Sequence, residues 1–239
     1  PAYFRLGVHF ACVGALLFPT MPDQRLRAGI PVIAEGFLVL LAGVWFVNLT
    51  NFMDGIDWLT VACVVPATLF LGLLGFAGGL DSVAAVLALG LCGGLIGFAP
   101  ANRPVARLFL GDVGSLPIGL LLAYLLYRLA ISGAWIAALL LPLYSVCDAT
   151  FTLFRRLIRR ERVWEAHRSH IYQRATDNGF SVKSVCLHLF CLNLVLCGLA
   201  SLSIWSSRLD VGIVTLTAGL GLTVILMRHF SRPRGSLGG

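Results

Sequence analysis

The sequence is poor in charge. Asp, Glu, Lys and Arg make up 12% of its 239 residues, against roughly 25% in an average soluble domain. Hydrophobic residues make up 58%, and the mean hydropathy of +0.89 indicates more apolar surface than a soluble fold of this size can bury. Disordered chains have the opposite composition, so disorder is excluded as well. What remains is a polytopic membrane protein with a formal net charge of +7.

Cysteine pairs of the metal-binding or redox kind are also missing. None of the seven cysteines forms a Cys-x-x-Cys pair, so zinc ribbons and dithiol redox motifs have no support. Seven cysteines in a chain of this length do not make a disulfide scaffold either. The start of the chain has no charged segment followed by a cleavable apolar core, so no secretory signal peptide is visible.

Apolar segments fill most of the chain. Eight of them approach the length of about 20 residues that a membrane helix needs. They cover roughly 5–22, 31–49, 58–77, 80–99, 113–130, 133–152, 184–205 and 210–228. The sequence therefore predicts an all-α, polytopic transmembrane helix bundle in which residues 1–239 form a single integral-membrane domain. Residues 153–183 are its main loop, and Gly90, Gly93, Gly94 and Gly97 suggest close helix contacts.

Arginine and lysine are divided unevenly between the two sides of such a bundle. Fourteen lie on the side that holds both termini and the loops 50–57, 99–112 and 153–183. The four on the other side are Arg25, Arg27, Arg128 and Arg208. Because positively charged loops stay in the cytoplasm, we expect the first side to be cytoplasmic. The polar residues best suited to chemistry fall on this same side.

Two Asn and two Asp surround the first of these loops, namely Asn48, Asn51, Asp54 and Asp57. Charged groups close to hydrocarbon are costly and are usually functional. Asn and Asp oxygens suit a hard cation such as Mg²⁺. Asn, Asp and Gly are also frequent turn formers, so a simple polar turn is the alternative. The pattern leaves both interpretations open.

The second loop ends in Phe109-Leu-Gly-Asp112-Val-Gly-Ser115, which places a carboxylate at the mouth of the next span. One interpretation is that Asp112 only caps the helix that begins there. The free N–H groups of a helix start also favour phosphate. A magnesium-binding carboxylate beside such a start would suit a diphosphate substrate.

The third loop carries a dense group of donors. His167, Arg168 and His170 lie within four residues, and Arg174 follows. Such groups fit phosphate oxygens, whereas zinc is disfavoured because no third ligand is close in sequence. The arginine pairs 155–156 and 159–160 could anchor the loop to anionic lipid headgroups. Asp148, at the end of the sixth span, either stabilises these arginines or binds substrate.

In this order, the three loops resemble the polyprenyl-phosphate N-acetylhexosamine-1-phosphate transferases, glycosyltransferase family 4. The strings are Asn48-x-x-Asn51-Phe-Met-Asp54-Gly-Ile-Asp57, Phe109-Leu-Gly-Asp112-Val-Gly-Ser115 and Ala166-His167-Arg168-Ser169-His170-Ile-Tyr172-Gln173-Arg174. The resemblance spans the whole chain. The His string is closest to the bacterial O-antigen branch and differs from the string usual in phospho-muramoyl-pentapeptide transferases.

The resemblance implies a reaction. A UDP-N-acetylhexosamine would donate its sugar-1-phosphate to undecaprenyl phosphate, giving UMP and an undecaprenyl-diphospho-sugar that starts a surface polysaccharide such as lipopolysaccharide O-antigen. The implied cofactor is Mg²⁺, with Mn²⁺ able to substitute. The implied location is the bacterial inner membrane, with the catalytic face cytoplasmic. Membrane lipid is a further partner, nucleic acid is not, and a homodimer is left open.

The resemblance also assigns roles to residues. Asp112 matches the family's metal-ligand Asp, and Asp54 and Asp112 are the expected catalytic residues. The expected substrate-binding residues are Asn48, Asn51, Asp57, His167, Arg168, His170 and Arg174. Asn51 and Asp54 match the loop that shapes the nucleotide and metal site in the family. His167, Arg168 and His170 match the loop that would contact the diphosphate or the uridine-sugar.

The sequence departs from the family pattern in two places. Family members carry adjacent aspartates on an upstream cytoplasmic loop, and no Asp-Asp pair occurs here. We therefore expect an N-terminally truncated chain, the C-terminal two-thirds of an enzyme. A catalytically inactive remnant is the first alternative; a membrane transporter, which would show internal repeats and polar groups near the midplane, is the second. Trp58 stands where the family often has Gly.

Overall fold

The computed structural model describes residues 2–20, 31–162 and 167–233. Within these ranges it contains helices and no strand, which confirms the all-α prediction. The elements are α1 (Ala2–Leu17), η1 (Phe18–Thr20), α2 (Val32–Phe52), α3 (Leu59–Phe76), α4 (Ser82–Phe98), α5 (Gly111–Leu129), η2 (Ala130–Ala134), α6 (Trp135–Leu140), α7 (Leu143–Ile158), α8 (Ile171–Asp177), α9 (Val182–Ser206) and α10 (Leu209–Phe230). Arg25, Arg27 and Ala166, which entered the sequence predictions, lie outside the described residues.

Most of the predicted spans are helices of the expected kind. Five helical runs are long and apolar enough to cross a membrane: α2, α3, the run Gly111–Leu140, α9 and α10. The helices α1 and α4 are apolar but shorter, with 16 and 17 residues. The ends of α2, α3, α4, α9 and α10 agree with the predicted spans to within about three residues, because apolar content marks the segments that enter a membrane.

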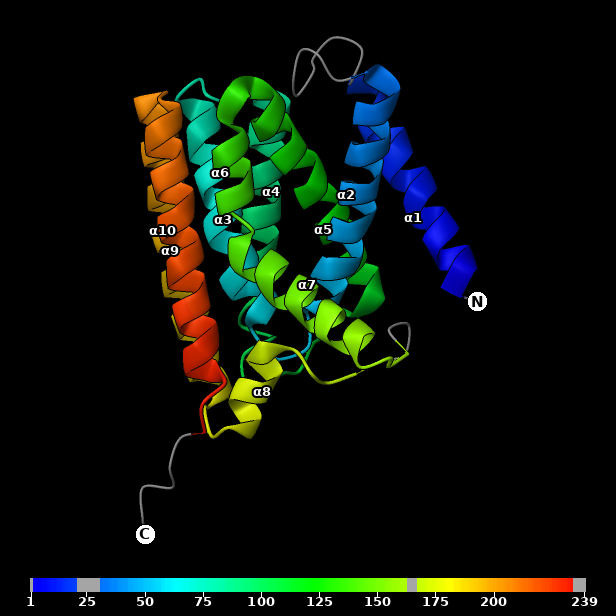
Figure 1. The fold of residues 1–239 in the computed structure, drawn as a ribbon, viewed down its shortest axis with the longest axis vertical. Helices are drawn as coiled ribbons and strands as arrows, with labels where there is room; N and C mark the ends of the chain where they lie inside the picture. The colour runs from blue at the N-terminus through cyan, green and yellow to red at the C-terminus, as the bar shows by residue number, and fades with distance from the viewer. Residues whose placement is uncertain (1, 21–30, 163–166, 234–239) are drawn as a thin grey trace.

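The predicted span 133–152 is wrong as a single helix. Gly133, with φ 95°, turns the chain after α5, and α6 then runs for only six residues. Pro142 separates α6 from α7, since proline has no N–H to donate and its ring clashes with the preceding turn. The helix α7 continues to Ile158, past the predicted end, and lies obliquely across the lower part of the bundle (Figure 1).

The glycines that make close helix contacts are not the predicted ones. A Cβ added to Gly90, Gly93, Gly94 or Gly97 of α4 would meet nothing within 4 Å, so these glycines make no tight contact. A Cβ on Gly75 of α3 would collide with the Ala85 side chain of α4. Added Cβ atoms would also meet neighbouring helices closely at Gly43 of α2, Gly119 of α5 and Gly219 of α10. The glycines that make close helix contacts are therefore spread over several helices other than α4.

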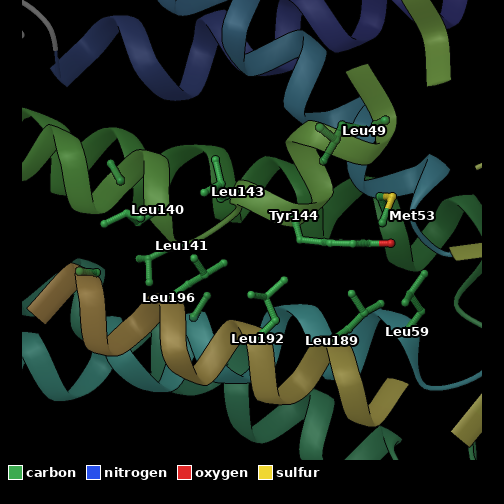
Figure 2. Packing of buried hydrophobic residues seen from close by; sticks show 14 of the residues in the cluster. Leu49, Met53, Leu59, Leu140, Leu141, Leu143, Tyr144, Leu189, Leu192 and Leu196 are labelled. Atoms are coloured by element: carbon green, nitrogen blue, oxygen red, sulfur yellow. The ribbon is translucent and has the colours of Figure 1, made fainter. Parts of the chain in front are cut away.

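Leucine side chains fill the interior between α6, α7 and α9. Figure 2 shows the leucines of α6 and α7 facing those of α9, and the ring of Tyr144 extending toward Met53. The labelled leucines of this layer are Leu140, Leu141, Leu143, Leu189, Leu192 and Leu196. Tyr144 is fully buried, so the first turn of α7 is fixed against the end of α2 and the start of α3.

The polar loops meet at one end of the bundle. In Figure 1 the α2–α3 loop, the α4–α5 loop and α8 lie at the lower end, as does the end of α10. The α3–α4 and α9–α10 turns lie at the upper end. The predicted placement of these loops on one side of the bundle therefore holds although the sixth span is broken. The reason is that α6 and α7 together still return the chain to the lower end.

Candidate functional site

Asp112 is the point where three helices meet. It lies in the first turn of α5, and its carboxylate accepts a hydrogen bond from Asn51 Nδ2 of α2 at 2.9 Å. The Arg5 guanidinium of α1 pairs with it at 3.3 Å, yet the Asp112 side chain is still 57% exposed. The N-cap of α5 is Leu110, with no side-chain cap. Asp112 is therefore not the cap of its helix, and its oxygens remain open to a ligand.

Asn51 also joins the two polar strings. Its Nδ2 donates to Ser115 Oγ at 2.8 Å as well as to Asp112. Ser115 is buried and donates in turn to Gly111 O at 2.8 Å, inside the first turn of α5. One amide thus fixes the end of α2 against the start of α5, which favours the site interpretation of this loop over a simple polar turn.

Asp54 is held in a partly buried place next to the start of α3. Its Oδ1 accepts a hydrogen bond from Thr60 Oγ1 at 2.6 Å. Burial raises the pKa of the Asp54 carboxyl to about 6, and the Thr60 hydroxyl opposes that shift. A carboxyl of this kind changes its charge just below neutral pH, as tuned acid–base groups do.

Asp57 and Asn48 both bond to backbone groups. Asp57 Oδ2 accepts the Ala106 N–H at 3.1 Å, which ties the α2–α3 loop to the α4–α5 loop. Asn48 Nδ2 donates to Val44 O of its own helix at 2.8 Å. The contacts of these two side chains within the chain therefore brace the scaffold.

The rings of the two histidines of the third loop pack together with those of Phe52, at the end of α2, and Tyr172, in α8. The ring centroids of the two histidines are 4.9 Å apart, and His170 stacks on Phe52 and on Tyr172 at 6.2 and 5.6 Å. Burial, together with neighbouring His170 and Arg156, lowers the pKa of His167 to about 4. His167 is therefore neutral at pH 7 and offers one ring N–H and one bare ring nitrogen.

Asp148 holds this cluster in place. It is fully buried, and its oxygens accept the backbone N–H groups of Ile171 and Tyr172 at 2.9 and 3.1 Å. Three side chains add to this set, namely Tyr144 and Thr152 through their hydroxyls and His170 through Nδ1 at 3.3 Å. A carboxylate at the start of α8 is favoured by the free N–H groups there. Asp148 thus neither pairs with the arginines nor lies open to substrate. It positions residues 167–172, which we call the His loop.

Tyr172 and Gly55 fasten α8 to the α2–α3 loop. Tyr172 Oη donates to Phe52 O at 2.8 Å, across 120 residues of sequence. A Cβ on Gly55 would collide with the Tyr172 hydroxyl and with Gln173 Nε2. Glycine is therefore required at this position for the two loops to pack, and the His loop lies directly beside the α2–α3 loop.

Two arginines of the third loop, Arg155 and Arg156, are bound to the protein, whereas Arg159 and Arg160 are exposed. Arg155 Nη2 donates to Ser169 O at 2.9 Å, and Arg156, 5% exposed, binds Glu161 Oε2 at 2.9 Å. For these two the lipid-headgroup interpretation is wrong, because each is used inside the fold. Arg168 is exposed and bonds to Thr176 Oγ1 at 3.3 Å within its own loop, and Arg174 is half-buried.

The residues around Asp112 suit a metal ion that is bound partly by the protein and partly by substrate phosphates and water. In the described ranges, no three His, Cys, Asp or Glu side chains converge closely enough to hold a metal ion by themselves. Mg²⁺, however, is usually held by one or two carboxylates together with substrate phosphates and water. The exposed carboxylate of Asp112 fits that kind of binding.

Some contributors to this site could not be identified from sequence. Arg5 reaches Asp112 from the start of an apolar helix, and Thr60 reaches Asp54 from the first turn of another. Neither lies in a recognisable polar string. Phe52 belongs to such a string, but its stacking on His170 depends on a loop more than 100 residues away.

Comparison with known proteins gives a consistent result. The model of glycosyl transferase family 4 matches residues 2–130. The phospho-N-acetylmuramoyl-pentapeptide-transferase of Streptococcus thermophilus is 31% identical over 150 residues, covering 59% of this chain and 43% of that protein. The enzyme of the same name from Enterococcus faecalis is 35% identical over 140 residues, covering 52% and 40%.

A third relative aligns with more of the chain. The decaprenyl-phosphate N-acetylglucosaminephosphotransferase of Mycobacterium tuberculosis is 30% identical over 219 residues, covering 80% of this chain and 54% of that protein. The chain spans about half the length of the curated relatives it matches.

Proposed function

Because the chain belongs to glycosyl transferase family 4, we propose that it transfers an N-acetylhexosamine-1-phosphate from a UDP-sugar to undecaprenyl phosphate. The products are UMP and an undecaprenyl-diphospho-sugar. The observation that carries this proposal is the joining of Asp112, Asn51 and the His loop at one end of the bundle. A lipid phosphate at headgroup level and a water-soluble nucleotide sugar can meet only at such an end.

The chemistry is a displacement at phosphorus. An oxygen of the lipid phosphate attacks the β-phosphorus of the UDP-sugar, the bond from that phosphorus to the bridging oxygen breaks, and UMP leaves with that oxygen. Such reactions are catalysed mainly by positioning and by neutralising charge. Where Mg²⁺ is bound, it neutralises diphosphate charge, and Asp112 would hold it.

The chain's own side chains supply the remaining functions. Neutral His167 donates a ring N–H, and Arg168 brings a positive charge from the exposed part of the same loop. Both suit phosphate oxygens. Asp54 carries a negative charge above about pH 6, where it can accept a proton or a donor from the substrate.

The donor sugar is proposed to carry no peptide. The relative whose name specifies N-acetylglucosamine aligns with 80% of the chain, against 59% and 52% for the two pentapeptide transferases. The form of the His string supports the same choice and an O-antigen-type product. The excess of arginine at the lower end supports a cytoplasmic face in the bacterial inner membrane.

A panel of donors tests this proposal. Membranes that carry the native protein are given undecaprenyl phosphate and Mg²⁺, and UMP release is measured. We expect release from UDP-N-acetylglucosamine or UDP-N-acetylgalactosamine, and none from UDP-N-acetylmuramoyl-pentapeptide. Release only from the pentapeptide donor would refute the proposed donor class. The absence of UMP release from every donor would refute the proposed activity and favour the alternative of a catalytically inactive remnant.

The pH dependence of UMP release provides a second test, through Asp54. With a pKa of about 6, the wild-type rate should rise with pH through about 6 as the carboxyl ionises. Thr60→Val removes the donor that favours the ionised form, so the acid limb should move up by roughly 0.7 pH unit, the equivalent of a hydrogen bond of about 1 kcal/mol. Thr68→Val is the matched control, because Thr68 bonds only within α3.

Ionisation of Asp54 is expected to raise the rate of UMP release but to lower the folding stability of the protein. The pKa of the folded Asp54 carboxyl lies above its ordinary value of 3.8, so ionising it inside the protein costs free energy. That cost develops as the pH rises from about 4 to about 6 and is constant above this range.

In the rate experiment, an acid limb of the pH profile that stays in place in Thr60→Val, or shifts equally in Thr68→Val, would contradict the assignment of Asp54.

A further inference from the structure

A basic pocket opens beside the α4–α5 loop. The residues that line it are Trp58, Arg103, Pro104, Val105, Arg107 and Lys183. Its three cations come from two separate segments, the α4–α5 loop and the first turn of α9. None of these residues contacts Asp112 or the His loop through an interaction seen in the described residues. We propose that this basic pocket binds the phosphate of an anionic phospholipid headgroup.

The pocket is built on a braced loop. The Trp58 backbone N–H donates to Asn102 Oδ1 at 2.8 Å, and its indole Nε1 donates to Ala99 O at 2.7 Å. Asn102, which is buried, donates in turn to Leu108 O at 2.9 Å. Trp58 has φ 66°, a left-handed conformation that costs a non-glycine residue energy and persists only where the surroundings enforce it. The loop therefore holds Arg103 and Arg107 in a defined place.

The charges of the pocket favour an anion. In the described part of the chain, Arg103, Arg107 and Lys183 have no ion-pair partner, and no carboxylate lines the pocket. Asp57 is adjacent to Trp58 in sequence, but its Oδ2 accepts the Ala106 N–H. Three cations on two segments match the oxygens of one phosphate group better than a single point charge would.

The apolar surroundings identify a lipid rather than a soluble phosphate. Val105 is 92% exposed and Leu108 is 53% exposed, and both lie between or beside the two arginines. Alternating cations and exposed aliphatic side chains are typical of a surface that contacts headgroups and the upper part of acyl chains. Trp58 fits the same interpretation, because tryptophan is enriched at the membrane–water interface.

Lipid binding to the purified full chain tests the proposal. The probe is phosphatidylglycerol, with phosphatidylcholine as the neutral reference, and bound lipid is counted by native mass spectrometry from a zwitterionic detergent. The pocket variant is Arg103→Gln with Arg107→Gln. The control is Arg228→Gln with Arg232→Gln, which removes the same charge from exposed sites at the same end of the bundle.

We expect wild-type protein to retain phosphatidylglycerol over phosphatidylcholine, and the pocket variant to bind phosphatidylglycerol roughly 30-fold more weakly than the control variant. Equal losses in the two variants would refute the pocket, since charge alone would then explain binding. Equal retention of the two lipids by wild type would refute it without any variant. Unchanged lipid binding with weakened binding of UDP would assign the pocket to a soluble phosphate and overturn the lipid assignment.

Discussion

Replacing Asp112 with Asn is expected to lower UMP release by at least about 100-fold, the loss that removal of one preorganised electrostatic contact typically causes. The substitution keeps the shape of the side chain and its place beside Asn51. It removes the negative charge that would hold a cation against the diphosphate. The expected effect is therefore on the rate, with little effect on the amount of folded protein in the membrane.

The matched control for this substitution is Asp210→Asn. Asp210 also lies in the first turn of a helix and pairs with an arginine, Arg208, at 2.6 Å. It is exposed at the opposite end of the bundle, so its loss should leave UMP release unchanged. Full activity in Asp112→Asn, or equal losses in both variants, would rule out the assignment of Asp112.

Replacing Asp148 with Ala is expected to cost about 3–5 kcal/mol of folding free energy. Five donors converge on this buried carboxylate, and two of them are the backbone N–H groups that start α8. Without their acceptor these groups stay buried and unpaired. The start of α8 should then detach, and with it the Tyr172 contact to Phe52.

Thr152→Val gives the scale for this effect. Thr152 is also fully buried and donates one hydroxyl to Asp148 at 3.2 Å, so its loss should cost only about 1 kcal/mol. Both variants are compared with wild type by thermal unfolding in one detergent at one scan rate, because unfolding of such proteins is often irreversible. An Asp148→Ala midpoint equal to that of Thr152→Val would show that Asp148 does not hold the His loop.

Sequence was a good guide to the spans and a poor one to their continuity. Apolar content alone marks α2, α3, α9 and α10, because a segment long and apolar enough to cross a membrane forms a helix there. The same criterion does not detect the break at Pro142, because it averages apolar content over about 20 residues and so spans the break. It also selected the wrong glycines, because small residues pack only where a neighbouring helix faces them.

The meeting of the polar strings was predictable, and their contacts were not. Counting spans places the three loops at one end of the bundle whatever their detailed packing. The Asn51–Asp112 hydrogen bond joins residues 61 positions apart, and nothing local announces it. Asp148 illustrates the limit most clearly, because its position in an apolar span suggested function, whereas its partners are five donors of the protein itself.

The measurement that tests the central claim most directly follows the β-phosphorus of the donor. UDP-N-acetylglucosamine labelled at that phosphorus is given to membranes carrying the native protein, together with undecaprenyl phosphate. Transfer of a sugar-1-phosphate predicts that the label enters the lipid fraction and that UMP appears in equal amount. Label that leaves as UDP, with unlabelled sugar on the lipid, would contradict the account, because the reaction would then break the bond to the sugar instead.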